Sequence, residues 1–241
     1  ARFVKGKAGE TPPTYLELQT HAHTHEMKVA VVRYNAGNIF SVIHALKRLG
    51  VEPLLTDSPV ELRSADRVIF PGQGEASGAM RYLREHGLDE VIRSLTQPVL
   101  GICIGQQLMC RHSEEGDVDC LGIFDADVKR FHPLRHEDKI PHMGWNSLRT
   151  LPTSPEGEGL SSMSSWLPRS PLPGEEAGVR LPFVYFVHSY YVPLCQHTAA
   201  VTEYIHPFSA AMRKDNFYAT QFHPEKSGAM GQQILRNFLE I

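Results

Sequence analysis

The chain has few cysteines, little net charge and no long apolar run. Its 241 residues include four cysteines, and no two of them form a C-x-x-C pair. Such pairs are typical of zinc sites and redox-active disulfides, so neither is expected, and a few unpaired cysteines favour a reducing, cytoplasmic compartment. The formal net charge is −3 with both signs interspersed, which indicates neither a nucleic-acid partner nor a membrane surface. No stretch approaches the ~18 apolar residues of a membrane-spanning helix.

Two segments differ in composition from the rest of the chain. Residues 1–26 show no sustained periodicity, and we expect them to be a leader or an added extension outside the fold. Their HAHTH run would hold a metal ion only fortuitously, so no metal site and no cofactor are predicted. Residues 152–180 are rich in Pro, Ser, Gly and Glu, which predicts a surface excursion. Residues 27–241 are long enough to form one large domain.

The first half of this domain alternates apolar strand-like runs with helical patterns. Strands are predicted at 29–34, 53–57, 67–70 and 98–102, and helices at 38–50, from about 76 to 95 and behind residue 103. This alternation predicts right-handed crossovers and a parallel sheet that is covered by helices on both faces.

The second half is richer in strands. They are predicted at 123–131, 184–192, 198–204 and as a pair within 209–222, and an amphipathic helix closes the chain over 228–241. Asp215 and Asn216 suit the tight turn of that pair, which needs positive φ. The predicted fold class is therefore α/β, with a mixed, mostly parallel central sheet flanked by helices and with antiparallel strands in the C-terminal half.

Cys103 stands between a strand-like run and a helical pattern, with Gly101 and Gly105 two residues away on either side. A strand-to-helix turn of this kind lies at the carboxyl edge of a parallel sheet, where ligands bind. It also exposes the side chain at its apex on strained backbone, and the helix start behind it favours the thiolate. A cysteine taken singly more often only packs, but this combination predicts a nucleophile.

His223 is the predicted base for this nucleophile, because it follows a strand and has Glu225 two residues further on. Pro224 between them favours an extended conformation at His223, in which the side chains of His223 and Glu225 share a face. The carboxylate would then orient the imidazole, which gives a Cys–His–Glu relay. Without Cys103, the same two residues would be read as part of a solvated loop.

A glycine-bearing turn follows the strand at 67–70. The backbone N–H groups of Gly72, Gln73 and Gly74, together with that of Ile104, could stabilise an oxyanion on a reacting carbonyl. An ordinary β–α turn also favours Pro and Gly, so the turn by itself distinguishes little.

Together, G-x-C-x-G-x-Q at 101–107, P-G-x-G at 71–74 and H-P-E at 223–225 resemble the class I, triad-type glutamine amidotransferases. IPHMGWNSL at 140–148 and YFVHSYYV at 185–192 are similar to signatures of one branch, the glutaminase subunits of imidazole glycerol phosphate synthase. The resemblance spans residue 27 to the C-terminus apart from 152–180, and it implies a flavodoxin-like fold.

The resemblance also implies a role for each residue. Cys103 would attack the side-chain amide of glutamine and form a γ-glutamyl thioester, His223 would protonate the departing ammonia and then activate water, and Glu225 would hold His223. Positions that match glutamine-binding residues are Gln107, Glu115, Ser189 and Tyr190, and positions that match the partner interface are Asn38, His142, Trp145 and Lys226.

The implied partner is a (β/α)8-barrel cyclase subunit, which would complete a heterodimer. There the ammonia would react with a phosphoribulosyl-carboxamide nucleotide and give imidazole glycerol phosphate and aminoimidazole carboxamide ribotide, in histidine biosynthesis. Two departures from the family pattern stand out. Arg33 and Asn35 replace the usual Asp and Gly of the opening turn, and Gln73 replaces a small β-branched residue in the oxyanion turn.

Three other functions fit part of the pattern. The same glutaminase chemistry could serve another synthase, such as one for pyridoxal phosphate, GMP or anthranilate. A free-standing cysteine hydrolase of γ-glutamyl peptides would turn over fully without a partner. A catalytically silent regulatory homologue is disfavoured, because Cys103, His223 and Glu225 are all present. Residues expected only to pack are Cys110, Cys120, Cys195 and His188.

Overall fold

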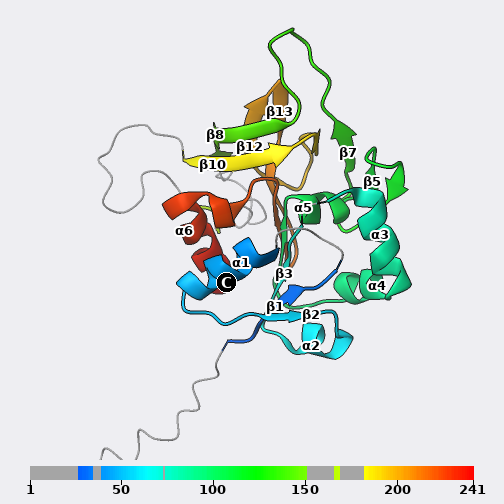
Figure 1. Cartoon of the computed structure of the whole chain (residues 1–241), viewed down its shortest axis with the longest axis vertical. Helices are drawn as coiled ribbons and strands as arrows, with labels where there is room; N and C mark the ends of the chain where they lie inside the picture. Colours follow the sequence, from blue (N-terminus) through cyan, green and yellow to red (C-terminus); the bar gives the residue numbers. More distant parts are fainter. Residues whose placement is uncertain (1–26, 35–38, 73, 151–165, 169–181) are drawn as a thin grey trace, which may run out of the picture.

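The computed structural model describes residues 27–34, 39–72, 74–150, 166–168 and 182–241. Within these ranges an eight-stranded sheet forms the centre of the molecule, in the order β2-β1-β3-β4-β14-β13-β12-β9 (Figure 1). The strands that pair in parallel are β1 (Val29–Val32), β2 (Leu54–Thr56), β3 (Arg67–Phe70), β4 (Val99–Ile102) and β14 (Phe217–Thr220). The antiparallel extension consists of β13 (His206–Lys214), β12 (Thr198–Tyr204) and β9 (Arg149–Thr150). The predicted fold class is confirmed.

Helices cover both faces of the parallel strands (Figure 1). One face carries α1 (Ile39–Arg48) and α6 (Gly228–Leu239), and the other carries α2 (Pro59–Ser64), α3 (Ala76–Glu85), α4 (Leu88–Arg93) and α5 (Ile104–Leu108). In β1, Val29 and Val31 pack on the first face while Ala30 and Val32 pack on the second. Since both faces are buried, the strands are continuously apolar and do not alternate.

Two helices replace the single one predicted from about residue 76 to 95. The chain breaks between α3 and α4 at Gly87, whose φ of 64° lies in the left-handed region. Glycine adopts this conformation at no steric cost, so it ends one helix and begins the next. The short α2 was not predicted, although Ser58 caps it by accepting from the backbone N–H of Glu61 and Pro59 occupies its first turn.

The strand predicted at 184–192 is likewise two strands. β10 (Phe183–His188) pairs with β8 (His142–Ser147) in a two-stranded sheet, whereas β11 (Tyr190–Tyr191) pairs with β7 (Asp127–Arg130). The second small sheet also contains β5 (His112–Ser113) and β6 (Val118–Asp119). The apolar run continues across Ser189, so periodicity does not reveal that the chain changes sheets there.

The turn between β13 and β14 has the positive φ that was predicted, 52° at Asp215. The predicted leader at 1–26 and most of the 152–180 excursion lie outside the described residues. Within the excursion, Trp166 and Leu167 are buried in the core, and the Trp166 ring packs edge-on against Tyr218 with centroids 5.5 Å apart. That part of the segment therefore packs on the domain.

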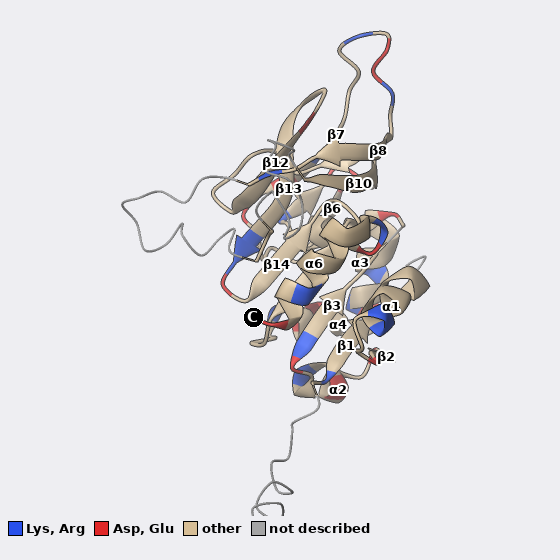
Figure 2. Ribbon diagram, turned by 90° about the vertical axis from the view of Figure 1, so that its left-hand side faces the viewer, with Lys and Arg blue, Asp and Glu red and all other residues tan. Residues whose placement is uncertain are grey.

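Charged residues of both signs are scattered along the ribbon in the view of Figure 2. This distribution agrees with the small net charge of −3. None of the helices in the described part of the chain is long and apolar enough to cross a bilayer.

Candidate active site

Cys103 lies at the sharp turn between β4 and α5, with φ 55° and ψ −106°. A non-glycine residue rarely adopts positive φ, and such strain costs about 1–3 kcal/mol that the surrounding packing must offset. Neighbouring strands hold the turn, because the backbone N–H of Cys103 donates to the Thr220 carbonyl on β14 at 2.7 Å. The predicted strained elbow is present.

The two glycines that flank this elbow permit close packing. A Cβ on Gly105 would lie 2.1 Å from the carbonyl oxygen of Phe70 on β3, and one on Gly101 would lie 2.9 Å from the Gly105 carbonyl group. Neither contact leaves room for a side chain. The nucleophile elbow therefore packs directly on the neighbouring strand.

His223 and Glu225 form a buried pair. Nδ1 of His223 lies 2.7 Å from Oε1 of Glu225, and the two side chains are only 2% and 3% exposed. His223 is extended, as predicted, but Pro224–Lys226 form a 3-10 turn (η2), so the residues do not share a strand face. Proline suits the first position of a helical turn, and the turn swings the carboxylate back to the imidazole.

Parallel pairing of β14 with β4 brings His223 to Cys103. The register sets Thr220 opposite Ile102, so the residues that follow both strands reach the same edge of the sheet. Burial alone would lower the pKa of His223, but the nearby sulfur of Cys103 and the hydrogen bond to Glu225 raise this pKa to about 10. Nε2 of His223 is buried and forms no hydrogen bond of full geometry with any described residue, so this nitrogen is available to exchange a proton at the active site.

A cavity of about 300 Å³ opens beside the sulfur. Its lining consists of Gly74, Cys103, Ile104, Gln107, Glu115, Val187, His188, Ser189 and Tyr190. All four predicted glutamine-binding residues are in this set, although they come from α5, a loop and the β10–β11 junction. The volume suits a small amino-acid-sized ligand. Burial raises the pKa of Glu115, and the N–H of Ala76, which donates to this carboxylate at 3.0 Å, opposes that shift.

Pro71 and Gly72 of the predicted oxyanion turn are tightly packed, whereas Gln73 lies outside the described residues. The Tyr34 hydroxyl donates to the Pro71 carbonyl at 2.5 Å, and a Cβ on Gly72 would lie 2.1 Å from Cγ2 of Ile104. Gly74 and Ile104 both line the cavity. A role for their N–H groups as oxyanion donors stays a prediction.

Two groups beside the sulfur were missed by the sequence analysis. The Val187 carbonyl accepts from the thiol at 3.8 Å, and Nε2 of Gln221 lies 3.7 Å from Sγ. A backbone carbonyl has no sequence signature. Gln221 directly precedes the F-H-P-E string, and that proximity was the only available signal.

The predicted interface residues differ in how exposed they are. Trp145 is 56% exposed on β8, whereas His142 on the same strand is buried, stacked on Tyr204 with ring centroids 4.0 Å apart. Side chains alternate along a strand, so His142 points inward where Trp145 points outward, and the interface role of His142 stays a prediction. Lys226 lies in η2 beside Glu225, and Asn38 lies outside the described residues.

Trp145 belongs to an exposed apolar patch on the two-stranded β8–β10 sheet. Met143 and Phe183 are 66% and 55% exposed, and the register of this strand pair puts both on the face that carries Trp145. Scattered exposed apolar residues are normal, but a group of large ones on one face is typical of an interaction site. We call Met143, Trp145 and Phe183 the β8–β10 patch.

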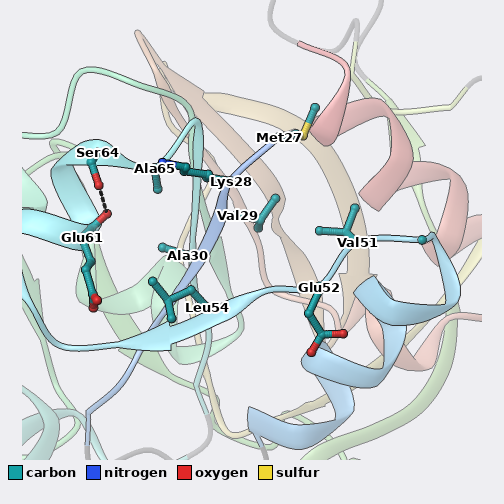
Figure 3. Close-up of a pocket in the computed structure, with 11 residues that line it drawn as sticks. Met27, Lys28, Val29, Ala30, Val51, Glu52, Leu54, Glu61, Ser64 and Ala65 are labelled. Atoms are coloured by element: carbon teal, nitrogen blue, oxygen red, sulfur yellow. Dashed lines mark hydrogen bonds between the residues drawn. The ribbon is translucent and has the colours of Figure 1, made fainter. Parts of the chain in front are cut away.

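A larger cavity of about 460 Å³ lies near the amino-terminal end of strand β1 (Figure 3). It is lined by Met27, Lys28, Leu54, Glu61 and Ala65, among others. Its lining contains neither a cysteine nor a histidine, so we assign the site to the smaller cavity. In the described part of the chain no cluster of three His, Cys, Asp or Glu side chains could hold a metal ion, and all four cysteines are free thiols.

Comparisons with known proteins identify the family of this chain. The family model "Glutamine amidotransferase class-I" matches residues 30–241. The chain is 61% identical over 215 residues to imidazole glycerol phosphate synthase subunit HisH of Bacteroides thetaiotaomicron, covering 89% of this chain and 100% of that one. It is 42% identical over 216 residues to the subunit of the same name from Idiomarina loihiensis, covering 89% and 98%.

Solved structures show the same fold at low identity. A glutamine amidotransferase superposes with a TM-score of 0.62 at 20% identity, covering 88% of this chain and 97% of that chain. PurLQS from Thermotoga maritima superposes with a TM-score of 0.57 at 17% identity, covering 89% and 98%. The chain therefore belongs to the class-I glutamine amidotransferase family, and within it to the imidazole glycerol phosphate synthase HisH subunits.

Proposed function

We propose that this chain hydrolyses glutamine to glutamate and ammonia and passes the ammonia to a (β/α)8-barrel cyclase subunit in histidine biosynthesis. The observation that carries the proposal is the meeting of Cys103 with the buried His223–Glu225 pair beside a cavity of about 300 Å³. The name shared by the relatives, a synthase subunit, supports the assignment to this pathway.

The first half of the reaction forms a thioester. Sγ of Cys103 attacks the side-chain amide carbon of glutamine, and the C–N bond breaks after the nitrogen receives a proton from His223. Because the pKa of His223 is raised to about 10, the imidazole carries that proton at neutral pH. Negative charge develops on the carbonyl oxygen, and backbone N–H groups near Gly74 and Ile104 are the proposed donors to it.

The second half hydrolyses the thioester. His223, now neutral, takes a proton from water as the hydroxyl oxygen attacks the thioester carbon, and the C–S bond breaks to release glutamate and restore the thiolate. The carboxylate of Glu225 holds the ring by its bond to Nδ1 and stabilises the imidazolium each time it forms.

The proposed glutamine contacts follow from the cavity lining. Glu115 supplies a carboxylate for the substrate α-ammonium group, and Gln107, Ser189 and Tyr190 supply polar groups around the amino-acid end. Burial of part of Glu115 strengthens its pairing with a cation, because the local dielectric is lower than that of water.

The proposed partner surface consists of the β8–β10 patch and Lys226. A protonated ammonia molecule cannot act as a nucleophile, so a partner that covers the site conserves the product as ammonia. The exposed indole of Trp145 is an apolar anchor for such a partner. The free thiols suit a reducing compartment, which supports a cytoplasmic location.

The decisive experiment measures glutamate release by the chain alone and with the barrel subunit and its nucleotide bound. We expect little release alone and strong stimulation by the loaded partner. Full turnover without any partner would instead indicate a free-standing hydrolase. As a control, Cys103→Ala should abolish glutamine hydrolysis and leave synthesis from added ammonium salts intact. Loss of both activities in this variant would contradict the division of labour.

A further inference from the structure

Gln221 has no role in the chemistry described above, yet its amide lies against the nucleophile. The side chain is fully buried immediately after β14, and Nε2 lies 3.7 Å from Sγ of Cys103. Its backbone N–H donates to the Ala210 carbonyl at 2.8 Å, which fixes the residue to β13. Burying a primary amide is costly unless it is hydrogen-bonded, so its partners are informative.

The neighbouring groups determine which end of this amide faces the sulfur. Nε2 of Gln107 donates to the Tyr190 carbonyl at 3.0 Å and to Oε1 of Gln221 at 2.9 Å. A carbonyl oxygen only accepts, so Tyr190 forces the NH₂ group of Gln107 into this position. Oε1 of Gln221 then faces Gln107, and its N–H groups face the sulfur.

The Tyr190 carbonyl also accepts from a second series of hydrogen bonds, which runs through two histidines. Nδ1 of His188 donates to Tyr190 at 2.7 Å, Nε2 of His188 lies 3.0 Å from Nδ1 of His142, and Nε2 of His142 lies 3.3 Å from Nδ2 of Asn146. For these bonds to hold, both rings must be neutral and carry their proton on Nδ1.

The surroundings keep both rings neutral. Burial lowers the pKa of His142 to about 4 and that of His188 to about 3, and His142 is stacked between the rings of Phe186 and Tyr204. At neutral pH every hydrogen bond in this series therefore points the same way, with the donors running from Asn146 on β8 inward to the Tyr190 carbonyl.

We infer that Gln221 is a positioning residue, which donates an N–H to the sulfur of Cys103 and holds it in place for attack. The thiol donates to the Val187 carbonyl at 3.8 Å, a contact that a thiolate cannot make. The Gln221 donor, in contrast, strengthens when the sulfur becomes negative, because hydrogen bonds to charged groups are stronger than neutral ones. Gln221 thus favours the reactive form. This role rests on the proposed function of Cys103 as the nucleophile.

The test replaces Gln221 by methionine, which has similar length and no N–H. Iodoacetamide alkylation of Cys103 in the isolated chain, followed by mass spectrometry of its peptide, should slow by about tenfold or more, as expected for a lost bond to a charged acceptor. In the complex with the barrel subunit, kcat for glutamine hydrolysis should fall by a similar factor while KM changes less than twofold. Gln221→Leu repeats the test if methionine disturbs folding.

Gln106→Met is the matched control. Gln106 is also a fully buried glutamine, but its Nε2 donates to the Ser209 carbonyl at 3.0 Å and makes no bond to Cys103. We expect a lower melting temperature in this variant and an unchanged alkylation rate. The inference is overturned if Gln221→Met is alkylated at the wild-type rate, or if it raises KM with kcat unchanged. Absence of glutamine hydrolysis in the wild-type complex would refute the proposed function instead, and the alkylation comparison would still decide the role of Gln221.

Discussion

Nδ1 of His223 lies 2.7 Å from Oε1 of Glu225 with both side chains almost fully buried. A buried pair of this kind is expensive to form and more expensive to break, because removing one partner leaves an uncompensated charge, at a cost of about 3–5 kcal/mol. His223 caps the 3-10 turn that carries Glu225, three residues beyond the end of strand β14, which pairs with β4. The His223–Glu225 pair therefore affects both the stability of the fold and the reactivity of the active site.

Glu225→Gln tests how much the Glu225 carboxylate contributes to the rate of glutamine hydrolysis. The amide keeps the size of the side chain but loses the charge that supports the imidazolium, so we expect glutamine hydrolysis in the complex to fall by about 10² or more. Glu240→Gln, at the exposed end of α6, is the control and should be silent. A rate within threefold of wild type for Glu225→Gln would show that His223 needs no carboxylate partner. The measurement is steady-state glutamate release at saturating glutamine.

The buried histidines predict an acid limit to stability. In the unfolded chain His142 and His188 titrate near pH 6.5, but in the fold burial lowers their pKa values to about 4 and about 3. Between pH 6.5 and 4 the unfolded state therefore binds more protons, and the free energy of unfolding must fall as the pH is lowered. Urea titrations at pH 7 and pH 4.5 measure this loss. In His142→Asn, the part of the loss that is due to His142 should disappear, and an identical pH dependence in that variant would contradict the assignment.

Gly105→Ala should disrupt the nucleophile elbow. The new Cβ would lie 2.1 Å from the Phe70 carbonyl oxygen, so strand β3 or helix α5 must shift, at a cost of about 1–3 kcal/mol or more. Gly78→Ala in α3 is the matched control, because its Cβ would meet the flexible ends of two side chains, Glu75 at 3.3 Å and Arg81 at 3.9 Å. We expect that control to be neutral or slightly stabilising, since alanine favours a helix. Equal melting temperatures for the two variants would show that the close approach is not required.

Trp145→Ala should weaken binding of the barrel subunit without affecting the isolated chain. The indole is 56% exposed, so its truncation removes little core packing, whereas an aromatic anchor at an interface typically contributes 2 kcal/mol or about 30-fold in Kd. Val60→Ala provides the control, because Val60 is 74% exposed on α2, at the other edge of the sheet. Calorimetric titration with the partner measures both. An unchanged Kd for Trp145→Ala would exclude the β8–β10 patch from the interface.

Short-range rules were enough to predict much of this protein from its sequence. The alternation of strand and helix follows from apolar periodicity, and the elbow at Cys103 follows from its bracketing glycines. The pairing of His223 with Glu225 was also predicted, but through an extended backbone, whereas the structure uses a 3-10 turn. These features depend on residues within a few positions of one another.

The tertiary structure alone decided which distant groups meet. Gln221 reaches the sulfur because β14 pairs with β4, and no local pattern specifies that pairing. His142 points inward and Trp145 outward because the two-stranded β8–β10 sheet turns one of its faces to the core. Strand register and side-chain packing arise from the whole folded chain, and a shift of one residue in register would exchange the two faces. The local sequence was therefore enough to predict Cys103 as the nucleophile, whereas the tertiary structure determined which groups surround it.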